Sequence, residues 1–224
     1  MNSYDAIARH MDISCVKSSH SRRDIDALVA AARRYPFAAA FALPCHTPYL
    51  VKYLKNSATK VGGTVGFPSG CTTTATKVFE AGALLDMGCD ELDMVLNIGE
   101  LKSGHMQFVQ DDIAAVVQQA RGKPVKAILE VTLLTDEEIV KGCEAAVRAG
   151  VAYVKTGTGW MPEPTTVTHI QLMRKAVGDR VQIKAAGGIR DLHTLLEMKA
   201  AGCNRFGIGL RHAVSILREA GAPD

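Results

Sequence analysis

Five ionisable side chains fall inside short apolar segments of this chain, where charged residues are uncommon. They are the acids Asp12, Asp93 and Glu130 and the lysines Lys155 and Lys184. Ionisable groups are rarely buried in a folded protein unless they are paired or functional. A lysine beside a second cation has a lowered pKa, and its uncharged amine attacks carbonyl groups to form an imine. Two lysines beside an acid therefore indicate Schiff-base chemistry, with the acid relaying the proton.

Side-chain alternation along the predicted strands places these five residues. Successive residues of a strand point to opposite faces. Within residues 91–97, one face carries only leucine and methionine, while Asp93 lies on the other. In a barrel the apolar face points outward to the helices, so Asp93 should point inward. The same test turns the other four residues inward. The alternative is a salt-bridged plug that only fills the interior.

Short apolar segments alternate with longer amphipathic segments along the whole chain. The predicted strands are residues 10–15, 37–43, 60–66, 91–97, 125–132, 151–156, 180–185 and 204–208, and the predicted helices are residues 24–34, 48–56, 72–87, 106–121, 136–149, 164–177, 191–200 and 211–219. Such alternation predicts a parallel sheet with helical crossovers, either open and doubly wound or closed as a barrel. The open sheet usually carries a Gly-x-Gly-x-x-Gly string after its first strand, and none is present there. We therefore expect an α/β fold, a single-domain (β/α)8 TIM barrel over residues 1–224.

Composition excludes several classes of function. The 224 residues include 26 Lys and Arg against 23 Asp and Glu, a net charge of +3, and the basic residues are scattered. A nucleic-acid surface usually shows a basic stripe, so none is expected. No segment approaches the ~20 apolar residues of a membrane span, and the amino terminus lacks a secretory pattern. The six cysteines and seven histidines match no metal or disulfide template. We expect a cytoplasmic protein with reduced thiols, no metal and no cofactor.

Five strings of the sequence carry a resemblance to a known family. They are Val65-Gly-Phe-Pro-Ser-Gly70, Glu91-Leu-Asp-Met-Val-Leu-Asn-Ile98, Lys126-Ala-Ile-Leu-Glu130, Val154-Lys-Thr-Gly-Thr-Gly159 and Ile183-Lys-Ala-Ala-Gly-Gly-Ile-Arg-Asp191. Each string is moderately specific, and their order along the predicted strands makes them strong together. They resemble the deoxyribose-phosphate aldolase family, class I aldolases on a (β/α)8 barrel. The match runs from Met11 to Ile216.

The resemblance implies reversible cleavage of 2-deoxy-D-ribose 5-phosphate to acetaldehyde and D-glyceraldehyde 3-phosphate. Lys155 falls on the imine-forming lysine, Lys184 on the lysine that depresses its pKa, and Asp93 on the acid of the proton relay. Asp12 falls on an acid that orders the substrate and the relay. The substrate phosphate is expected at glycine-rich strand ends, where backbone N–H groups cradle anions. The expected substrate-binding residues are Asp12, Glu130, Gly159, Gly187, Gly188, Gly207, Gly209 and Arg211.

Four positions depart from the family pattern and bear on the substrate. Gly157 replaces the usual serine, Trp160 begins an altered loop, and Phe41 stands where the family has a cysteine. Arg211 follows a strand end where the family has serines, and it either holds the phosphate or is a solvated first-turn arginine. The alternatives are therefore the same chemistry on another phosphorylated sugar, or a non-catalytic sugar-phosphate binding barrel. The expected partner is a small phosphorylated sugar or aldehyde, without nucleic acid or membrane, and a homodimer is one assembly that the sequence allows.

Overall fold

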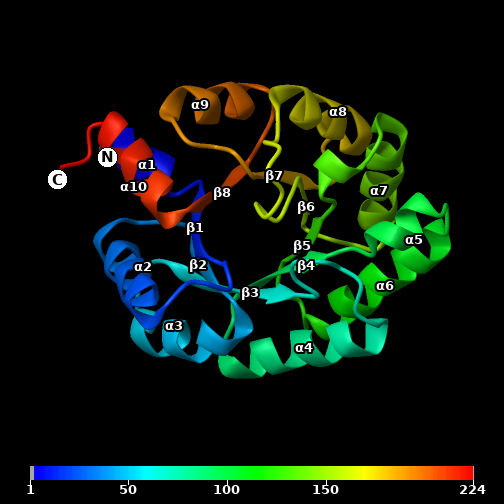
Figure 1. Ribbon diagram of the computed structural model, residues 1–224, viewed down its shortest axis with the longest axis horizontal. Coiled ribbons are helices and arrows are strands. Elements are labelled where there is room, and N and C mark those ends of the chain that lie inside the picture. Colours follow the sequence, from blue (N-terminus) through cyan, green and yellow to red (C-terminus); the bar gives the residue numbers. More distant parts are fainter. Residues whose placement is uncertain (1–2, 224) are drawn as a thin grey trace.

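A closed ring of eight parallel strands forms the centre of the structure (Figure 1). The structure is a computed structural model that describes residues 3–223. The strands are β1 (Met11–Cys15), β2 (Ala39–Ala42), β3 (Lys60–Val65), β4 (Glu91–Val95), β5 (Val125–Ile128), β6 (Tyr153–Lys155), β7 (Gln182–Ala186) and β8 (Arg205–Gly209). Each strand pairs with the next in sequence, and β8 pairs with β1. The closure confirms the predicted barrel and excludes the open sheet.

Helices surround the strands as an outer layer (Figure 1). They are α1 (Ser3–Ala8), α2 (Arg22–Arg34), α3 (Thr47–Leu54), α4 (Thr74–Met87), α5 (Ile98–Lys102), α6 (Met106–Gln119), α7 (Asp136–Arg148), α8 (Val167–Val177), α9 (Leu192–Ala200) and α10 (Leu210–Glu219), with 3-10 turns η1 (Pro44–His46) and η2 (Val131–Leu133). The sequence analysis missed α1 and α5, which have six and five residues. Both are too short for the helical spacing of apolar residues to become visible.

Local signals explain where several helices begin. Thr135 precedes α7, its hydroxyl accepts from the Glu138 N–H at 3.2 Å, and the Glu138 carboxylate accepts from the Thr135 N–H at 2.8 Å. This reciprocal pair satisfies N–H groups that the first helical turn leaves free. Thr166 caps α8 in the same way with His169, so that helix begins at Val167 and not at the predicted residue 164. The cap, and not the proline before it, sets the start of α8.

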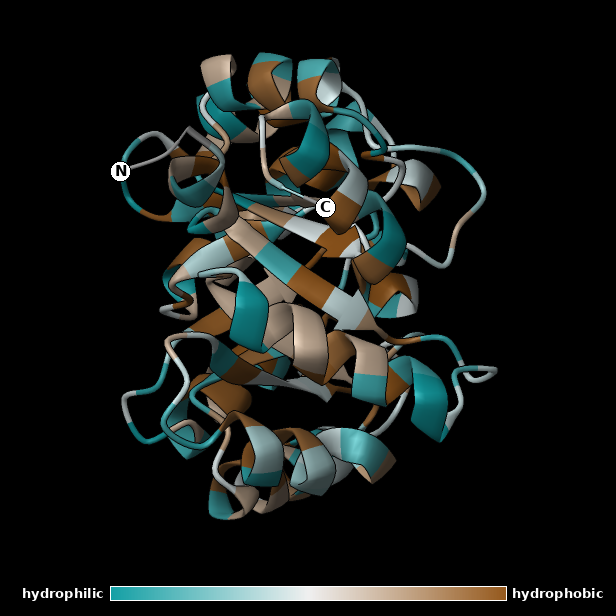
Figure 2. Ribbon diagram, turned by 90° about the vertical axis from the view of Figure 1, so that its left-hand side faces the viewer, coloured by the Kyte–Doolittle hydropathy of each residue, from teal (hydrophilic) through white to brown (hydrophobic). Residues whose placement is uncertain are grey.

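The apolar core lies between the outer face of the barrel and the helices. Outward strand residues such as Ile13, Leu92 and Ile183 are fully buried there. The helix ribbons in Figure 2 alternate between brown and teal along their length, as expected for helices with one apolar face. The interior of the barrel is different, because it holds charged side chains that are equally buried. Among the described residues, no helix has the length and apolarity needed to cross a bilayer.

Two strands end at least two residues earlier than predicted, with consequences for the site. β5 ends at Ile128, and Glu130 adopts a left-handed backbone conformation with φ of 58° before the turn η2. Side-chain alternation therefore does not extend to Glu130. β4 ends at Val95, and Asn97 instead caps α5 by accepting from the Glu100 N–H at 3.2 Å.

Candidate active site

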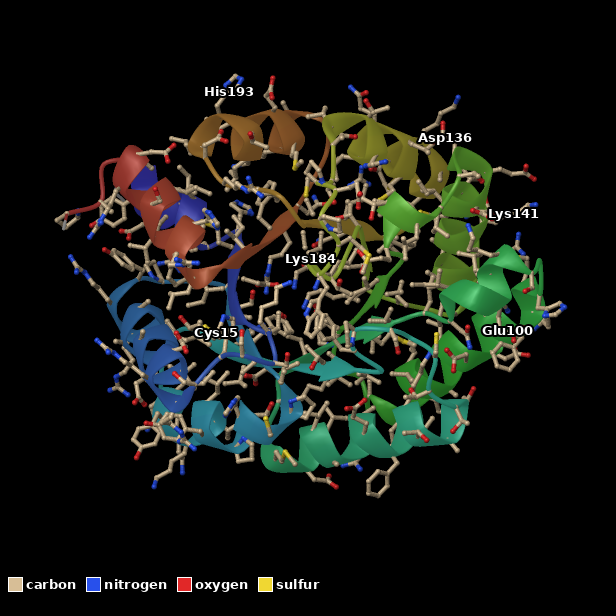
Figure 3. The ribbon with its side chains drawn as sticks, in the orientation of Figure 1. Cys15, Glu100, Asp136, Lys141, Lys184 and His193 are labelled. Atoms are coloured by element: carbon tan, nitrogen blue, oxygen red, sulfur yellow. The ribbon has the colours of Figure 1, made fainter. Side chains whose placement is uncertain are left out.

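Strand register brings the ionisable residues together inside the barrel. Asp93 on β4 is the register partner of Lys126 on β5, and Lys155 on β6 is the partner of Lys184 on β7. Neighbouring strands lie about 4.8 Å apart, so inward side chains of register partners approach one another. Figure 3 shows Lys184 within the ring of strands, whereas labelled residues such as His193 lie on the outer helices. The alternation test therefore placed these side chains correctly.

Asp93 is the centre of the cluster. Its Oδ2 accepts hydrogen bonds from Nζ of Lys155 at 2.7 Å and from Nζ of Lys184 at 2.6 Å. Its Oδ1 accepts from Nζ of Lys126 at 3.0 Å. Burial acts to raise the pKa of Asp93, but the three ammonium groups outweigh it and hold that pKa well below its ordinary value. Asp93 is therefore an ionised, fully buried carboxylate that joins the two lysines predicted to act together.

A second layer of charge lies beneath Asp93, toward the amino-terminal ends of the strands. Arg205 donates to Asp12 at 2.6 Å and to Oε2 of Glu91 at 3.1 Å, and Lys126 donates to Oε1 of Glu91 at 2.5 Å. Asp12 also contacts Nζ of Lys184 at 2.6 Å. The sequence analysis did not anticipate Arg205 or Glu91. Both are the first residues of strands, and alternation at a strand end does not show whether a charge is solvated or drawn inward.

Counting charges indicates that one amine of the cluster gives up its proton. Within residues 3–223 the network joins the cations Lys126, Lys155, Lys184 and Arg205 with the anions Asp12, Glu91 and Asp93. Four cations face three anions, so the buried network carries one excess positive charge when every group is ionised. Unbalanced charge is costly in a medium of low dielectric. A neutral Lys155 balances the network.

Lys155 is the amine on which these effects converge. Burial is the largest influence on its pKa and lowers it, Asp93 opposes that change, and Lys184 lowers the pKa further, to about 8. At pH 7 the neutral fraction is then about one in ten, compared with about one in 2500 for an ordinary lysine. The sequence analysis named the second ammonium as the cause. The structure makes burial the larger cause and the second ammonium an additional one.

An aromatic ring covers the lysines from the side of β2. Nζ of Lys184 lies 4.2 Å from the centroid of the Phe41 ring, and Nζ of Lys126 lies 5.0 Å from it. Ring faces attract cations, and the attraction grows when water is excluded. Gly62 on β3 makes room for the ring, because a Cβ atom there would lie 2.1 Å from it. Phe41, where the resemblance led us to expect a cysteine, lies against the second lysine.

The charged cluster opens into a cavity of about 270 Å³ at the carboxyl ends of the strands. In (β/α)8 barrels, reacting groups usually lie at this end. The sequence-predicted residues that line the cavity are Asp12, Asp93, Gly159, Lys155, Lys184, Gly187, Gly188, Gly207 and Gly209. Lys17, His20, Arg190 and His212 also line it and were not predicted. They lie on loops and a helix start, where no alternation pattern indicates the direction of a side chain.

Two predicted substrate-binding residues do not reach this cavity. Glu130 is buried beside it, and its carboxylate accepts from the N–H of Thr158 at 3.1 Å and from the Thr158 hydroxyl at 2.5 Å. A Cβ atom at Gly157 would lie 2.5 Å from Oε1 of Glu130, so a glycine allows this close approach. Glu130 therefore holds the loop after β6. Arg211 is exposed at the start of α10, and His212 lines the cavity instead.

Trp160 joins three loops at the mouth of the cavity. Its indole N–H donates to the carbonyl oxygen of Val16 at 2.9 Å, and its ring meets Phe67 edge-on at a centroid distance of 6.1 Å. Nζ of Lys17 lies 4.9 Å from the Trp160 ring and donates to the carbonyl oxygen of Gly159 at 2.8 Å. The loops after β1, β3 and β6 are therefore tied together around one aromatic side chain.

Known proteins share both the sequence and the fold. The sequence signature of the DeoC/LacD family aldolase matches residues 8–217. The deoxyribose-phosphate aldolase of Thermococcus kodakarensis is 47% identical over 226 residues, covering 97% of each chain. That of Streptococcus equi subsp. zooepidemicus is 45% identical over 212 residues, covering 95% of this chain and 96% of its own. The deoxyribose phosphate aldolase of Aeropyrum pernix, described as a unique tetramer, has a TM-score of 0.89 at 26% identity and covers 97% of this chain and 92% of its own. This chain belongs to the DeoC/LacD aldolase family.

Proposed function

We propose that this protein is a deoxyribose-phosphate aldolase, an aldehyde-lyase that reversibly cleaves 2-deoxy-D-ribose 5-phosphate to acetaldehyde and D-glyceraldehyde 3-phosphate. The observation that carries the proposal is the Lys155 amine, with a pKa near 8, in a cavity where it shares one carboxylate oxygen with a second lysine. The curated relatives named above carry the same activity in their names.

The proposed reaction begins when the neutral amine of Lys155 adds to the C1 carbonyl of the open-chain sugar. Loss of water leaves an iminium ion, which withdraws electrons from the adjacent carbon. The C3 hydroxyl then gives up its proton, the C2–C3 bond breaks, and its electron pair forms an enamine. D-Glyceraldehyde 3-phosphate departs. Protonation of the enamine at C2 and hydrolysis of the imine release acetaldehyde and restore the amine.

Asp93 supports this sequence by changing its partners as Lys155 changes charge. While Lys155 is an ammonium, Asp93 accepts from three cations at once. When Lys155 becomes a neutral amine, the carboxylate keeps two charged partners and is free to accept a proton-bearing group of the substrate. We assign Asp93 to the proton relay, Lys184 to the activation of Lys155, and Asp12 to holding Lys184 in place.

The substrate phosphate is proposed to lie at the ends of β7 and β8. Gly187, Gly188, Gly207 and Gly209 line the cavity there, and backbone N–H groups without neighbouring Cβ atoms can cradle an anion. Gly159 lines the same cavity from the loop after β6. Arg211 is exposed and lies outside the cavity lining, so the proposed phosphate site does not contain it.

The first experiment is borohydride reduction in the presence of 2-deoxy-D-ribose 5-phosphate, read by peptide mass spectrometry. We expect an alkylated peptide that contains Lys155, together with release of acetaldehyde in the absence of borohydride. The variant Lys155→Ala should show neither result. Labelling at another lysine would contradict the assignment.

The same assay separates the alternatives. Trapping with another phosphorylated sugar, without turnover of deoxyribose 5-phosphate, would support a class I aldolase with a different substrate. The loop around Trp160 gives a reason to test this, since Trp160 contacts Val16 and Phe67, which line the cavity. Thermal stabilisation by the sugar phosphate without any trapping would indicate a binding barrel that does not catalyse the reaction.

Three further features remain predictions. Residues 1–224 are proposed to form one aldolase domain, supported by the closure of β1 on β8. The six cysteines are all free, which supports the reducing cytoplasm as the place of action. For the assembly, light scattering distinguishes a homodimer from a tetramer like that of the Aeropyrum pernix protein.

A further inference from the structure

Thr64 on β3 is an inward-facing residue that the sequence analysis did not select. Two glycines before it establish the direction of its side chain. A Cβ atom at Gly62 would meet the Phe41 ring inside the barrel, whereas one at Gly63 would lie 3.0 Å from side-chain atoms of Leu84 and Leu92 outside it. By alternation, Thr64 faces inward like Gly62. Its side chain lines the same cavity as Lys155.

The hydroxyl of Thr64 has no hydrogen-bond partner in the part of the chain that the structure describes, although the residue is only 2% exposed. Other buried threonines are paired: the hydroxyl of Thr59 donates to the Ala32 carbonyl at 2.8 Å, and that of Thr156 to the Ala186 carbonyl at 2.9 Å. Thr132 also has an unpaired hydroxyl, but it lies in the turn η2 and outside the cavity lining. A buried unpaired hydroxyl is unfavourable by about 1–3 kcal/mol, so Thr64 calls for an explanation.

Thr64 lies between the charged cluster and the cavity. Its register partner is Asp93 on β4, about 4.8 Å away across the sheet. Both oxygens of Asp93 accept from lysines, and neither is hydrogen-bonded to the Thr64 hydroxyl. The open side of Thr64 is therefore the cavity, beside the carboxylate that we assign to the proton relay. Rotation about χ1 exchanges its hydroxyl and methyl branches, so that a ligand in the cavity can be reached.

We infer that the hydroxyl of Thr64 binds a hydroxyl group of the substrate's sugar chain. The inference rests on the proposed function and names a further contact within the same site. A threonine hydroxyl both donates and accepts, which suits a substrate hydroxyl that must be held while its proton leaves. Without this contact, the substrate hydroxyl would lose one hydrogen-bond partner inside the cavity. Sites built to bind a hydroxyl discriminate strongly for that reason.

The decisive variant is Thr64→Val, because valine has nearly the shape of threonine and lacks only the hydroxyl. Two reactions are compared. Cleavage of 2-deoxy-D-ribose 5-phosphate requires the sugar hydroxyls, whereas exchange of the acetaldehyde methyl protons for deuterium requires Lys155 and the relay but involves no sugar. We expect kcat/KM for cleavage to fall at least about tenfold. The rate of acetaldehyde exchange should stay within about twofold of the rate of the parent protein, since acetaldehyde carries no sugar hydroxyl.

Stability provides an independent readout. Thr64→Val removes an unpaired hydroxyl, so the melting temperature should be equal to or above that of the parent protein. Thr59→Val is the matched control: it makes the same chemical change just before β3, removes a hydroxyl that is paired, and should lower stability while leaving cleavage intact. Should Thr64→Val fail to fold, Thr64→Ser and Thr64→Ala differ only by the hydroxyl. Serine should then retain cleavage activity and alanine should lose it.

The remaining outcomes each overturn one statement. Unchanged cleavage by Thr64→Val would refute the contact. Equal losses in cleavage and exchange would place Thr64 on the amine or the relay and would also refute it. If the parent protein exchanges acetaldehyde protons but does not cleave deoxyribose 5-phosphate, the proposed substrate is wrong. The comparison is then run with the sugar phosphate that traps on Lys155.

Discussion

Replacing Lys184 by methionine should raise the pKa of Lys155 and slow imine formation at neutral pH. Methionine retains the length and the apolar stem of lysine, so its packing against Phe41 is preserved. What disappears is one ammonium on the shared Oδ2 of Asp93. The buried network then holds three cations and three anions, and a protonated Lys155 no longer produces an excess of charge.

The size of the effect follows from the geometry. Nζ of Lys155 lies 2.7 Å and Nζ of Lys184 lies 2.6 Å from the same oxygen, so the nitrogens are at most about 5 Å apart. At an effective dielectric constant of about 20, two unit charges at that distance repel by about 3 kcal/mol, which corresponds to about two pKa units. Burial remains in the variant and continues to lower the pKa. We therefore expect the pKa to rise from about 8 by about one to two units.

The assay is the rate of borohydride-trapped imine as a function of pH. At pH 7 the neutral fraction of Lys155 should fall about 10- to 100-fold, and the midpoint of the pH profile should move upward by about one to two pH units. Lys175→Met, which removes an exposed lysine on α8, is the control and should leave the profile unchanged. An unshifted midpoint in a folded Lys184→Met protein would refute activation by Lys184 and leave burial as the main cause of the low pKa.

Three further predictions concern the same cluster. Lys155→Met should stabilise the protein by about 3 kcal/mol at pH 7, because the pKa of this lysine is near 8 in the folded state and 10.5 in the unfolded state. The gain should shrink as the pH rises from 8 to 10.5, which chemical denaturation at several pH values would show. Asp93→Asn should reduce kcat at least about 100-fold with KM little changed, and a change in KM alone would contradict the relay role. The variant should also lower the free energy of unfolding by about 3–5 kcal/mol, since three ammonium groups lose their common anion. Gly62→Ala should displace the Phe41 ring and lower the melting temperature, and adding Phe41→Leu should recover part of the loss. A single variant that melts at the same temperature as the parent protein would show that the ring does not lie against the backbone of Gly62.

The barrel and its inward charges could be predicted because the signals for them are local. Alternation has a period of two residues, so five residues of a strand are enough to separate Asp93 from Leu92. The same rule placed Lys155 and Lys184 on the inside, and the register confirms that they are partners. Parallel strands with helical crossovers then bring such residues to one end of the barrel.

The same rule gave a wrong expectation where the strand stops. Glu130 follows the end of β5 in a left-handed conformation, so its carboxylate turns to the loop after β6 and not to the cavity. Arg211 lies in the first turn of α10 and is exposed, which agrees with the solvated alternative left open by the sequence. Lys17 and Trp160 lie on loops, and their meeting at the mouth depends on segments more than a hundred residues apart. Such directions come from packing, which no short pattern contains.

What the sequence determined by itself is the set of strands, their inward residues and the chemistry that two lysines and an acid can perform. The hydrogen bonds of Asp93, the layer of Glu91 and Arg205 beneath it, and the burial that mainly lowers the pKa of Lys155 all depend on the folded barrel. The alternation of side chains along a strand is a property of a few neighbouring residues. Burial and charge balance depend on all eight strands closing around one space, and they arise only when the barrel is complete.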